Sequence, residues 1–246
     1  MRTVKRLWWR QTMWELTLNF KNGEQLLLVV VIPVAIFLAA TTTNFLPSLA
    51  ESPAHALATV LAVSVLASAF TSVAISTAFE RRSGALLYMS TTPLGKSDVV
   101  LAKVIATLFT VLLSCGAVVL AALVTSFSTV TGLALMLPAV LVIVVCGAVA
   151  GASWALTLAS TLRAEGVLAL ANAIFVVAIL FGGVLIPLDQ LPQAWASVAQ
   201  FLLPGALTTA LTSVLASNSI DFFASAVVLV WAIAGTLMAS RFFRWI

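Results

Sequence analysis

The sequence has little charge, and this shortage excludes a soluble globular protein. Asp, Glu, Lys and Arg make up 8% of the 246 residues, whereas 62% of the residues are hydrophobic. A soluble domain carries about 25% charged residues, so a chain this apolar cannot cover a water-exposed surface with polar groups. Strands of an outer-membrane barrel would alternate apolar and polar residues in segments of about ten, and the sequence shows no such alternation. We therefore expect a helical bundle in a membrane.

Histidine and cysteine are equally scarce, which argues against a metal site and against most intramembrane enzymes. His55 lies in a predicted loop with no second His or Cys to share a metal. Cys115 and Cys146 lie in apolar runs and are interpreted as packed apolar side chains. An intramembrane metalloprotease needs H-E-x-x-H, and a serine protease of the membrane needs a histidine within a span. We expect no metal and no enzymatic activity on this chain.

The sequence also lacks the P-loop motif G-x-x-x-x-G-K-[ST], which cradles nucleotide phosphates. Any ATP and Mg²⁺ would therefore be bound by a partner, and we expect no cofactor on this chain. No Asp, Glu, Lys or Arg is evident within the predicted spans, although ion-coupled carriers normally have one there. The net charge of +4 is too small and too dispersed to indicate nucleic acid as a partner.

Long apolar runs show what the chain does contain. A spanning helix needs about 20 apolar residues, and six runs approach or exceed this length. They cover residues 26–43, 57–79, 104–126, 133–161, 167–187 and 222–240. In the fourth run, Gly147, Gly151 and Ser153 are small enough to allow close helix packing. The sequence predicts an all-α membrane protein with six transmembrane helices in a single domain, residues 1–246.

The basic residues predict the orientation of these helices. Five Lys or Arg lie in residues 1–25, four in 80–103, one in 161–166 and two at the C-terminus. The intervening loops 44–56, 127–132 and 188–221 contain none. Because cytoplasmic loops are enriched in Lys and Arg, we expect a multi-pass protein of the cytoplasmic membrane with both termini in the cytoplasm.

Residues 1–25 combine basic side chains with Trp8, Trp9 and Trp14. Tryptophan is enriched at headgroup depth, and amphipathic helices with this composition lie in the plane of the membrane surface. We expect an interfacial helix, with one face toward lipid and the other toward the bundle. A basic tail that only sets the topology is the alternative.

Residues 80–103 form the longest charged segment between two predicted spans. It begins with Glu80, Arg81 and Arg82, continues into a helix-forming stretch at 85–90, and is ended by a turn that contains Pro93. Three apolar side chains occur in this water-facing loop: Leu86, Leu87 and Met89. Exposed apolar side chains rimmed by charge are typical of a contact surface for another protein. The alternative is a short helix folded back onto its own bundle.

This loop resembles the one between spans 2 and 3 of ABC-2 type transporter permeases, the membrane subunits of type V ABC exporters. The resemblance rests on FERRSGAL at 79–86, TTPL at 91–94 and Lys103. Residues 161–172 are similar to the region between spans 4 and 5 of actinobacterial members. GGVLIPLDQLP at 182–192, followed by PGAL at 204–207, is similar to the segment after span 5.

The resemblance implies roles for these segments. Residues 84–92 would be a coupling helix that docks on an ATP-binding subunit, and the N-terminal helix would be a connecting helix. The docking residues would be Glu80, Arg81, Gly84, Leu86, Leu87, Met89 and Pro93. Within 188–221, residues 188–211 would form two short re-entrant helices that cap the exit. Their outer gate would comprise Pro187, Leu188, Asp189 and Pro192.

A translocation path is the last site expected. The polar residues that could line it are Asn172 in the fifth predicted span and Thr71, Ser72 and Ser76 in the second. Packing and hydrogen bonding between helices are the alternative role for the hydroxyl groups.

We expect the permease of an ATP-driven exporter for a hydrophobic or amphipathic substrate, a drug-like molecule or a lipid. Its partners would be an ATP-binding subunit, membrane lipid, and either a second copy or a paralogous permease. A membrane scaffold in a biogenesis pathway, such as haem-protein maturation, is the alternative function.

Overall fold

The structure, a computed structural model, describes residues 7–42, 52–125 and 133–243. All regular secondary structure in these ranges is helical. The helices up to residue 90 are α1 (Leu7–Lys21), α2 (Gly23–Leu26), η2 (Leu27–Val31), α3 (Ile32–Thr42), α4 (Pro53–Val65), η3 (Leu66–Ser72), α5 (Val73–Arg82) and α6 (Ala85–Ser90). The remaining helices are α7 (Lys96–Thr125), α8 (Leu133–Thr161), α9 (Ala164–Phe181), η5 (Leu188–Gln190), α10 (Gln193–Ala199), α11 (Leu203–Ala216) and α12 (Phe222–Phe242).

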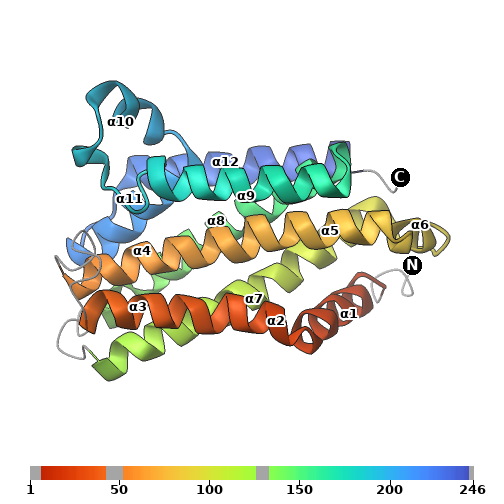
Figure 1. Cartoon of the computed structure of the whole chain (residues 1–246), viewed down its shortest axis with the longest axis horizontal. Coiled ribbons are helices and arrows are strands. Elements are labelled where there is room, and N and C mark those ends of the chain that lie inside the picture. Colours follow the sequence, from red (N-terminus) through yellow and green to blue (C-terminus); the bar gives the residue numbers. More distant parts are fainter. Residues whose placement is uncertain (1–6, 43–51, 126–132, 244–246) are drawn as a thin grey trace.

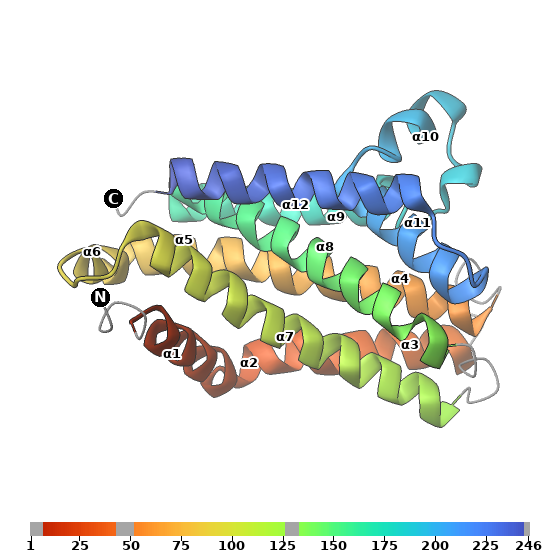
Figure 2. The ribbon, with the colours of Figure 1, turned by 180° about the vertical axis from the view of Figure 1, so that it is seen from behind.

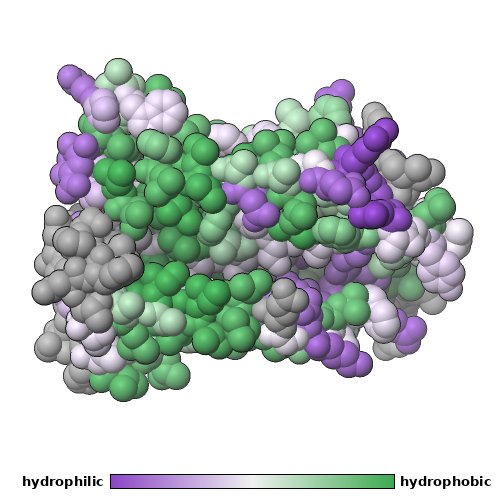
Figure 3. Space-filling model, viewed as in Figure 1, coloured by the Kyte–Doolittle hydropathy of each residue, from purple (hydrophilic) through white to green (hydrophobic). Residues whose placement is uncertain are grey.

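The helices run side by side along the long axis of the molecule (Figures 1 and 2). The start of α1, the end of α12 and the short helix α6 lie at one end, here called the α6 end. Helix α10 and the start of α4 lie at the opposite end, here called the α10 end. Hydrophobic side chains cover most of the middle of the face in Figure 3, and hydrophilic side chains gather toward the α6 end.

Within the described residues, five continuous helices are long and apolar enough to cross a membrane. They are Pro53–Arg82, Lys96–Thr125, Met136–Thr161, Ala164–Phe181 and Phe222–Phe242. The predicted first span is the shorter apolar helix Leu27–Thr42, and the fifth ends at Phe181 rather than at 187. The all-α membrane fold is confirmed, with each of the six predicted runs helical over most of its length.

Proline explains how the first apolar helix joins the bundle. Pro33 has no N–H, so the carbonyl of Val29, four residues earlier, loses its helical donor. The hydroxyl of Ser114 on α7 donates a hydrogen bond to this carbonyl at 2.5 Å. The backbone just before Pro33 widens into the π-helix η2. A neighbouring helix thus satisfies the freed group, as a membrane bundle requires.

Helix α8 lies at the centre and contacts η3, α4, α5, α7, α9, α11 and α12. Small residues allow these helices to approach closely. A Cβ added at Gly151 would lie 3.0 Å from the Cβ of Ala69, and one added at Gly147 would lie 2.8 Å from Leu207 Cδ1. The predicted close packing at both glycines is confirmed.

Helices α10 and α11 form a pair bent by 87°, which matches the predicted pair of short helices before the last span. Most of α11 is buried in the bundle, whereas α10 buries only Ala199. Two indole N–H groups hold this segment in place. Trp195 donates to the carbonyl of Phe181 at 2.7 Å, and Trp231 donates to the carbonyl of Phe201 at 2.8 Å.

Candidate functional site

The short helix α6 projects from its end of the bundle between α5 and α7 (Figure 1). Gly84 precedes it with φ +80°, a backbone conformation that side chains with a Cβ rarely adopt, so the chain can turn sharply between α5 and α6. Leu86 is only 1% exposed and belongs to a buried cluster with Val99 and Val100 of α7. This leucine therefore anchors α6 to the bundle.

The expectation that Leu86 is exposed is wrong. Because α6 packs on α7, only the side chains on its far face reach solvent. Leu87 is 50% exposed and Tyr88 is 75% exposed, while Met89 is half-buried. The exposed apolar surface of α6 is formed by Leu87 and Tyr88. The tyrosine was not among the predicted docking residues.

Helix α1 presents its polar face to the bundle and its aromatic face outward. Gln11 and Glu15 are buried, whereas Trp9 and Trp14 are exposed. The amide of Gln11 donates to Glu15 Oε1 at 2.9 Å and to the sulfur of Met89 at 3.7 Å. Helix α1 thus contacts α6 directly, through a side chain that the sequence analysis did not single out.

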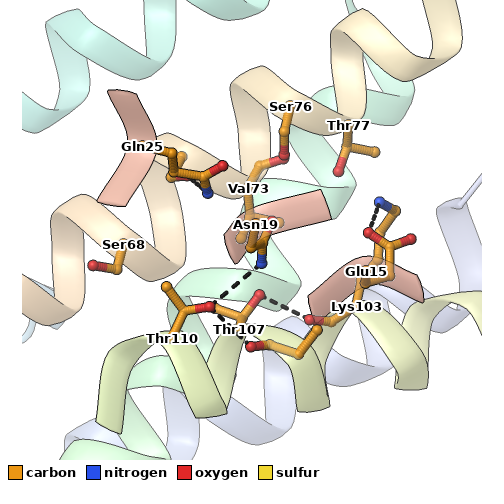
Figure 4. Close-up of a pocket in the computed structure, with 12 residues that line it drawn as sticks. Glu15, Asn19, Gln25, Ser68, Val73, Ser76, Thr77, Lys103, Thr107 and Thr110 are labelled. Atoms are coloured by element: carbon orange, nitrogen blue, oxygen red, sulfur yellow. Dashed lines mark hydrogen bonds and ion pairs between the residues drawn. The ribbon is translucent and has the colours of Figure 1, made fainter. Parts of the chain in front are cut away.

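A buried ion cluster joins three elements beside α6. The ammonium of Lys103 on α7 lies 2.9 Å from Glu15 Oε2 of α1 (Figure 4). It also lies 2.7 Å from Glu80 Oε2 of α5. Lys103 is 4% exposed. A buried charge is costly unless it is paired and hydrogen-bonded, and here one cation meets two carboxylates. We call these three residues the Lys103 triad.

The triad corrects the expectation that the apolar helices contain no charged residue. Residues 96–103 were assigned to a loop, but they form the first turns of α7, and this helix carries Lys103 into the bundle. Glu80, predicted to dock a partner, points its carboxylate at Lys103. Because the shortage of charge was one argument against ion-coupled transport, that argument fails.

Polar side chains continue from the triad into a narrow cavity between α1, η3, α5 and α7, with a volume of about 20 Å³ (Figure 4). This is room for about one water molecule. Asn19 donates to the hydroxyl of Thr110 at 3.3 Å, and Gln25 donates to the hydroxyl of Ser72 at 2.9 Å. The cavity is too small for a transported molecule, and two buried hydroxyls in its lining, Ser68 and Thr77, have no hydrogen-bond partner among the described residues.

Helical spacing is the signal that could have revealed this network. Three polar stripes recur at intervals of three or four residues and so lie on one face of each helix. They are Gln11, Glu15 and Asn19; Ser72, Ser76 and Glu80; and Lys103, Thr107 and Thr110. The prediction for the N-terminal helix rested on its tryptophans and basic side chains and left out its polar face.

Arginines form a second polar feature at the α6 end. A groove of about 510 Å³ is lined in part by Arg81, Arg82 and Arg163. The guanidinium of Arg81 donates to the carbonyl of Leu162, and Arg82 pairs with Glu165 at 2.5 Å. These contacts tie the end of α5 to the turn between α8 and α9.

The structure separates the residues predicted to line a path. Ser72 and Ser76 face the narrow cavity beside α1, and Thr71 is half-buried outside its lining. Asn172 is exposed on α9, where its amide donates to the carbonyl of Leu168 at 2.9 Å. These four residues therefore do not line one common path within this chain.

Three of the predicted gate residues lie together at the α10 end. Pro187, Leu188 and Asp189 line a cavity of about 300 Å³, while Pro192 immediately precedes α10. Gly183 shapes this region, because its φ is +80° and an added Cβ would lie 2.5 Å from Leu188 Cδ2.

The family model described as ABC-2 family transporter protein matches residues 18–241, which is most of the chain. The chain belongs to the ABC-2 family. No curated protein sequence matches it. The match contains the Lys103 triad except for Glu15, together with α6 and the α10–α11 pair.

As an ABC-2 permease, the chain is a multi-pass membrane subunit of an ABC transporter, and the family implies an ATP-binding partner.

Proposed function

We propose that this permease is the membrane half of an ATP-driven exporter and that its ATP-binding subunit docks on the α6 end. The observation that carries the proposal is the pair of exposed apolar side chains, Leu87 and Tyr88, on a helix otherwise anchored in the bundle. Apolar and aromatic side chains at the centre of a polar rim are the usual energetic core of a protein interface. The rim here is formed by the arginines of α5 and the α8–α9 turn.

The Lys103 triad gives this docking surface a mechanical role. Movement of α6 would reach α1 through Gln11 and Met89, and would reach α5 and α7 through the paired charges. Charge pairs at 2.7 and 2.9 Å in a dry environment resist separation, so the three helices would move as one unit. A displacement imposed by ATP binding would thereby reach two membrane helices.

A second permease would complete the transport path. Helix α9 exposes most of its apolar surface, including Ile174, Val177 and Phe181. The exposed Asn172 lies on the same helix, and an amide facing lipid is unfavourable unless another helix covers it. We place a second permease, identical or paralogous, against α9. A path bounded by such apolar faces suits a hydrophobic or amphipathic substrate, since an ionic solute would leave its charge unpaired.

The α6 end would face the cytoplasm, because the basic loops belong on that side. In a Cys115→Ala/Cys146→Ala background, a membrane-impermeant maleimide added outside intact cells is expected to label Asp189→Cys and to leave Ser83→Cys unlabelled. Both positions are exposed in the structure, so access to solvent does not bias the comparison. The opposite labelling pattern would invert the proposed orientation.

The docking proposal is tested by Leu87→Asp/Tyr88→Asp in permease reconstituted with its ATP-binding subunit. Two buried charges at the centre of an interface should weaken subunit binding more than about tenfold and should remove substrate-stimulated ATP hydrolysis. Val198→Asp in α10 is the matched control, because Val198 is 48% exposed and lies at the opposite end.

The control should bind the subunit as the unaltered permease does. Wild-type binding by the α6 variant, measured by co-purification, would exclude α6 as the docking site. For the substrate, ATP hydrolysis should rise with apolar and amphipathic compounds and should not respond to small ions. Stimulation by ions alone would refute the proposed substrate class while leaving docking intact.

A further inference from the structure

The cavity of about 300 Å³ at the α10 end has a largely apolar wall that also carries a group of hydroxyls. It lies between α4, α11 and the segment around η5, away from the Lys103 triad. The hydroxyl-bearing residues of its lining are Thr59, Thr208, Thr209, Thr212, Ser213 and Ser217. His55 and Asp189 complete the polar part of the wall.

Several of these side chains have no internal hydrogen-bond partner among the described residues. Threonines in helices often donate to the carbonyl four residues earlier, and Thr208 does so to Pro204 at 3.0 Å. Thr59, Thr209 and Thr212 do not make this bond within the described part of the chain. Thr59 is only 3% exposed. Because buried polar groups are nearly always hydrogen-bonded, the Thr59 hydroxyl needs a partner inside the cavity, and the half-buried hydroxyls of Thr209 and Thr212 are free to bond the same partner.

The chemistry of the wall defines what that partner can be. Each hydroxyl both donates and accepts hydrogen bonds, so the complementary ligand must do both. No Lys or Arg lines the cavity among the described residues, so an anionic group would find no countercharge there. The volume is at the lower end of the range for small-molecule sites, which suits a group the size of one ring.

We propose that this cavity binds a polyhydroxyl group, either a sugar or a polyol. The unpaired hydroxyls of α4 and α11 would contact its hydroxyls, and the carboxylate of Asp189 would accept from it at the mouth. Val184, Leu185 and Leu188 form the apolar part of the wall and could contact a lipid tail. The same polyhydroxyl chemistry occurs in a free sugar and in a glycolipid headgroup.

This site is independent of the proposed docking of an ATP-binding subunit. It lies at the opposite end of the bundle, and binding there requires neither ATP nor a partner chain. Loss of sugar binding would leave the α6 proposal intact, and failure of docking on α6 would leave this site intact.

The test measures protection of a cysteine at the mouth of the cavity in the full-length permease, held in phosphatidylcholine nanodiscs. Ser217→Cys is introduced in the Cys115→Ala/Cys146→Ala background, because Ser217 lines the cavity and is exposed. Methyl glucoside, octyl glucoside, octyl phosphate and octyltrimethylammonium are added separately before a maleimide. Saturable slowing of labelling by a glucoside, and not by the two charged probes, is the expected result.

The two glucosides distinguish the sources of the sugar. Equal protection by methyl and octyl glucoside would indicate a free sugar, and protection by octyl glucoside alone would indicate a lipid headgroup. No protection by either glucoside, or equal protection by all three octyl compounds, would overturn the proposal. Preferential protection by octyltrimethylammonium would also overturn it, in favour of a cation site at Asp189.

Threonine variants identify the groups responsible. Thr59→Val/Thr209→Val/Thr212→Val keeps the side-chain shape and should weaken glucoside binding about tenfold or more through lost hydrogen bonds. Thr236→Val on α12, whose hydroxyl donates to Ala232 at 2.7 Å outside the cavity, is the control and should bind normally. Thr209→Val and Thr212→Val are also measured singly, because both positions are only half-buried and tolerate change best. Unchanged glucoside affinity in all three variants would overturn the proposal.

Discussion

The two ends of the bundle differ in their charge pairing and in the size of their cavities, although each has hydroxyls without a hydrogen-bond partner among the described residues. At the α6 end, Lys103 is paired with two carboxylates, and Asn19 and Gln25 bond to hydroxyls of neighbouring helices. At the α10 end, the described hydroxyls of Thr59 and Thr212 face a cavity instead. The cavity beside the triad measures about 20 Å³, and the one at the α10 end about 300 Å³.

This difference shows what each end is built for. Paired charges fix the distance between the helices that carry them, so the α6 end suits the transmission of a force. The larger cavity leaves space in front of its hydroxyls, so the α10 end suits the binding of a molecule. If the contrast is correct, removing a charge at one end should cost more than any comparable change at the other.

Lys103→Met should have the largest effect. The substitution leaves the buried Glu15 and the half-buried Glu80 without their cation, and loss of one partner of a buried pair typically costs about 3 to 5 kcal/mol. The free energy of unfolding, measured for the purified permease in mixed micelles, should fall by about this amount. Lys96→Met is the control, because Lys96 lies seven residues earlier on the same helix and is exposed.

The triple variant Glu15→Gln/Lys103→Met/Glu80→Gln isolates the reason for that loss. It removes all three charges, so it should recover much of the lost stability, because a buried ion pair and a neutral replacement are often close in free energy. If the paired charges couple the movements of α1, α5 and α7, the triple variant should still transmit a displacement of α6 to these helices less effectively than the unaltered permease. A triple variant less stable than Lys103→Met would show that charge pairing is not the cause.

The length of the apolar runs was sufficient to predict the all-α membrane fold. Apolar runs such as 104–126 and 222–240 are long enough that only a helix can satisfy their backbone groups in lipid. The pair α10–α11 could also be anticipated, because Pro192 and Pro204 interrupt a segment too apolar for a water-exposed loop. Helix ends were less predictable, since α9 stops at Phe181 where Gly182 and the turn after it replace the helical hydrogen bonds.

The candidate site was predicted only in part. The short helix α6 could be predicted from its sequence, but which of its leucines is exposed depends on how α6 folds back onto Val99 and Val100 of α7. The Lys103 triad joins residues 15, 80 and 103, and one-dimensional spacing cannot show which polar stripes meet. Helix α1 also reverses the usual pattern, with Gln11 and Glu15 inward and Trp14 outward.

Gly183→Ala should have an intermediate effect at the other end of the bundle. The glycine has φ +80° and an added Cβ would press on Leu188, so an alanine there should cost about 1 to 3 kcal/mol in local strain. Labelling of Ser217→Cys should also change, because Leu188 lines the same cavity. Gly116→Ala is the control, since no atom lies within 4 Å of its added Cβ, and a helical Gly→Ala change should stabilise by about 0.5 to 1 kcal/mol. A neutral Gly183→Ala variant would mean that the segment around η5 is not held in this conformation.

Arg82→Gln should have the smallest effect and tests whether burial, rather than charge pairing itself, gives the Lys103 triad its strength. Arg82 and Glu165 lie 2.5 Å apart, but their side chains are 60% and 65% exposed. Exposed pairs contribute about 0 to 1 kcal/mol, and salt screens them. The loss of unfolding free energy should therefore be small at about 0.1 M salt and should vanish near 1 M, where the Debye length falls to about 3 Å. The loss in Lys103→Met should persist at both salt concentrations, because its charges are shielded from solvent. Equal losses in the two variants would place both pairs in the same environment and would remove the distinction between a rigid buried cluster and a surface contact.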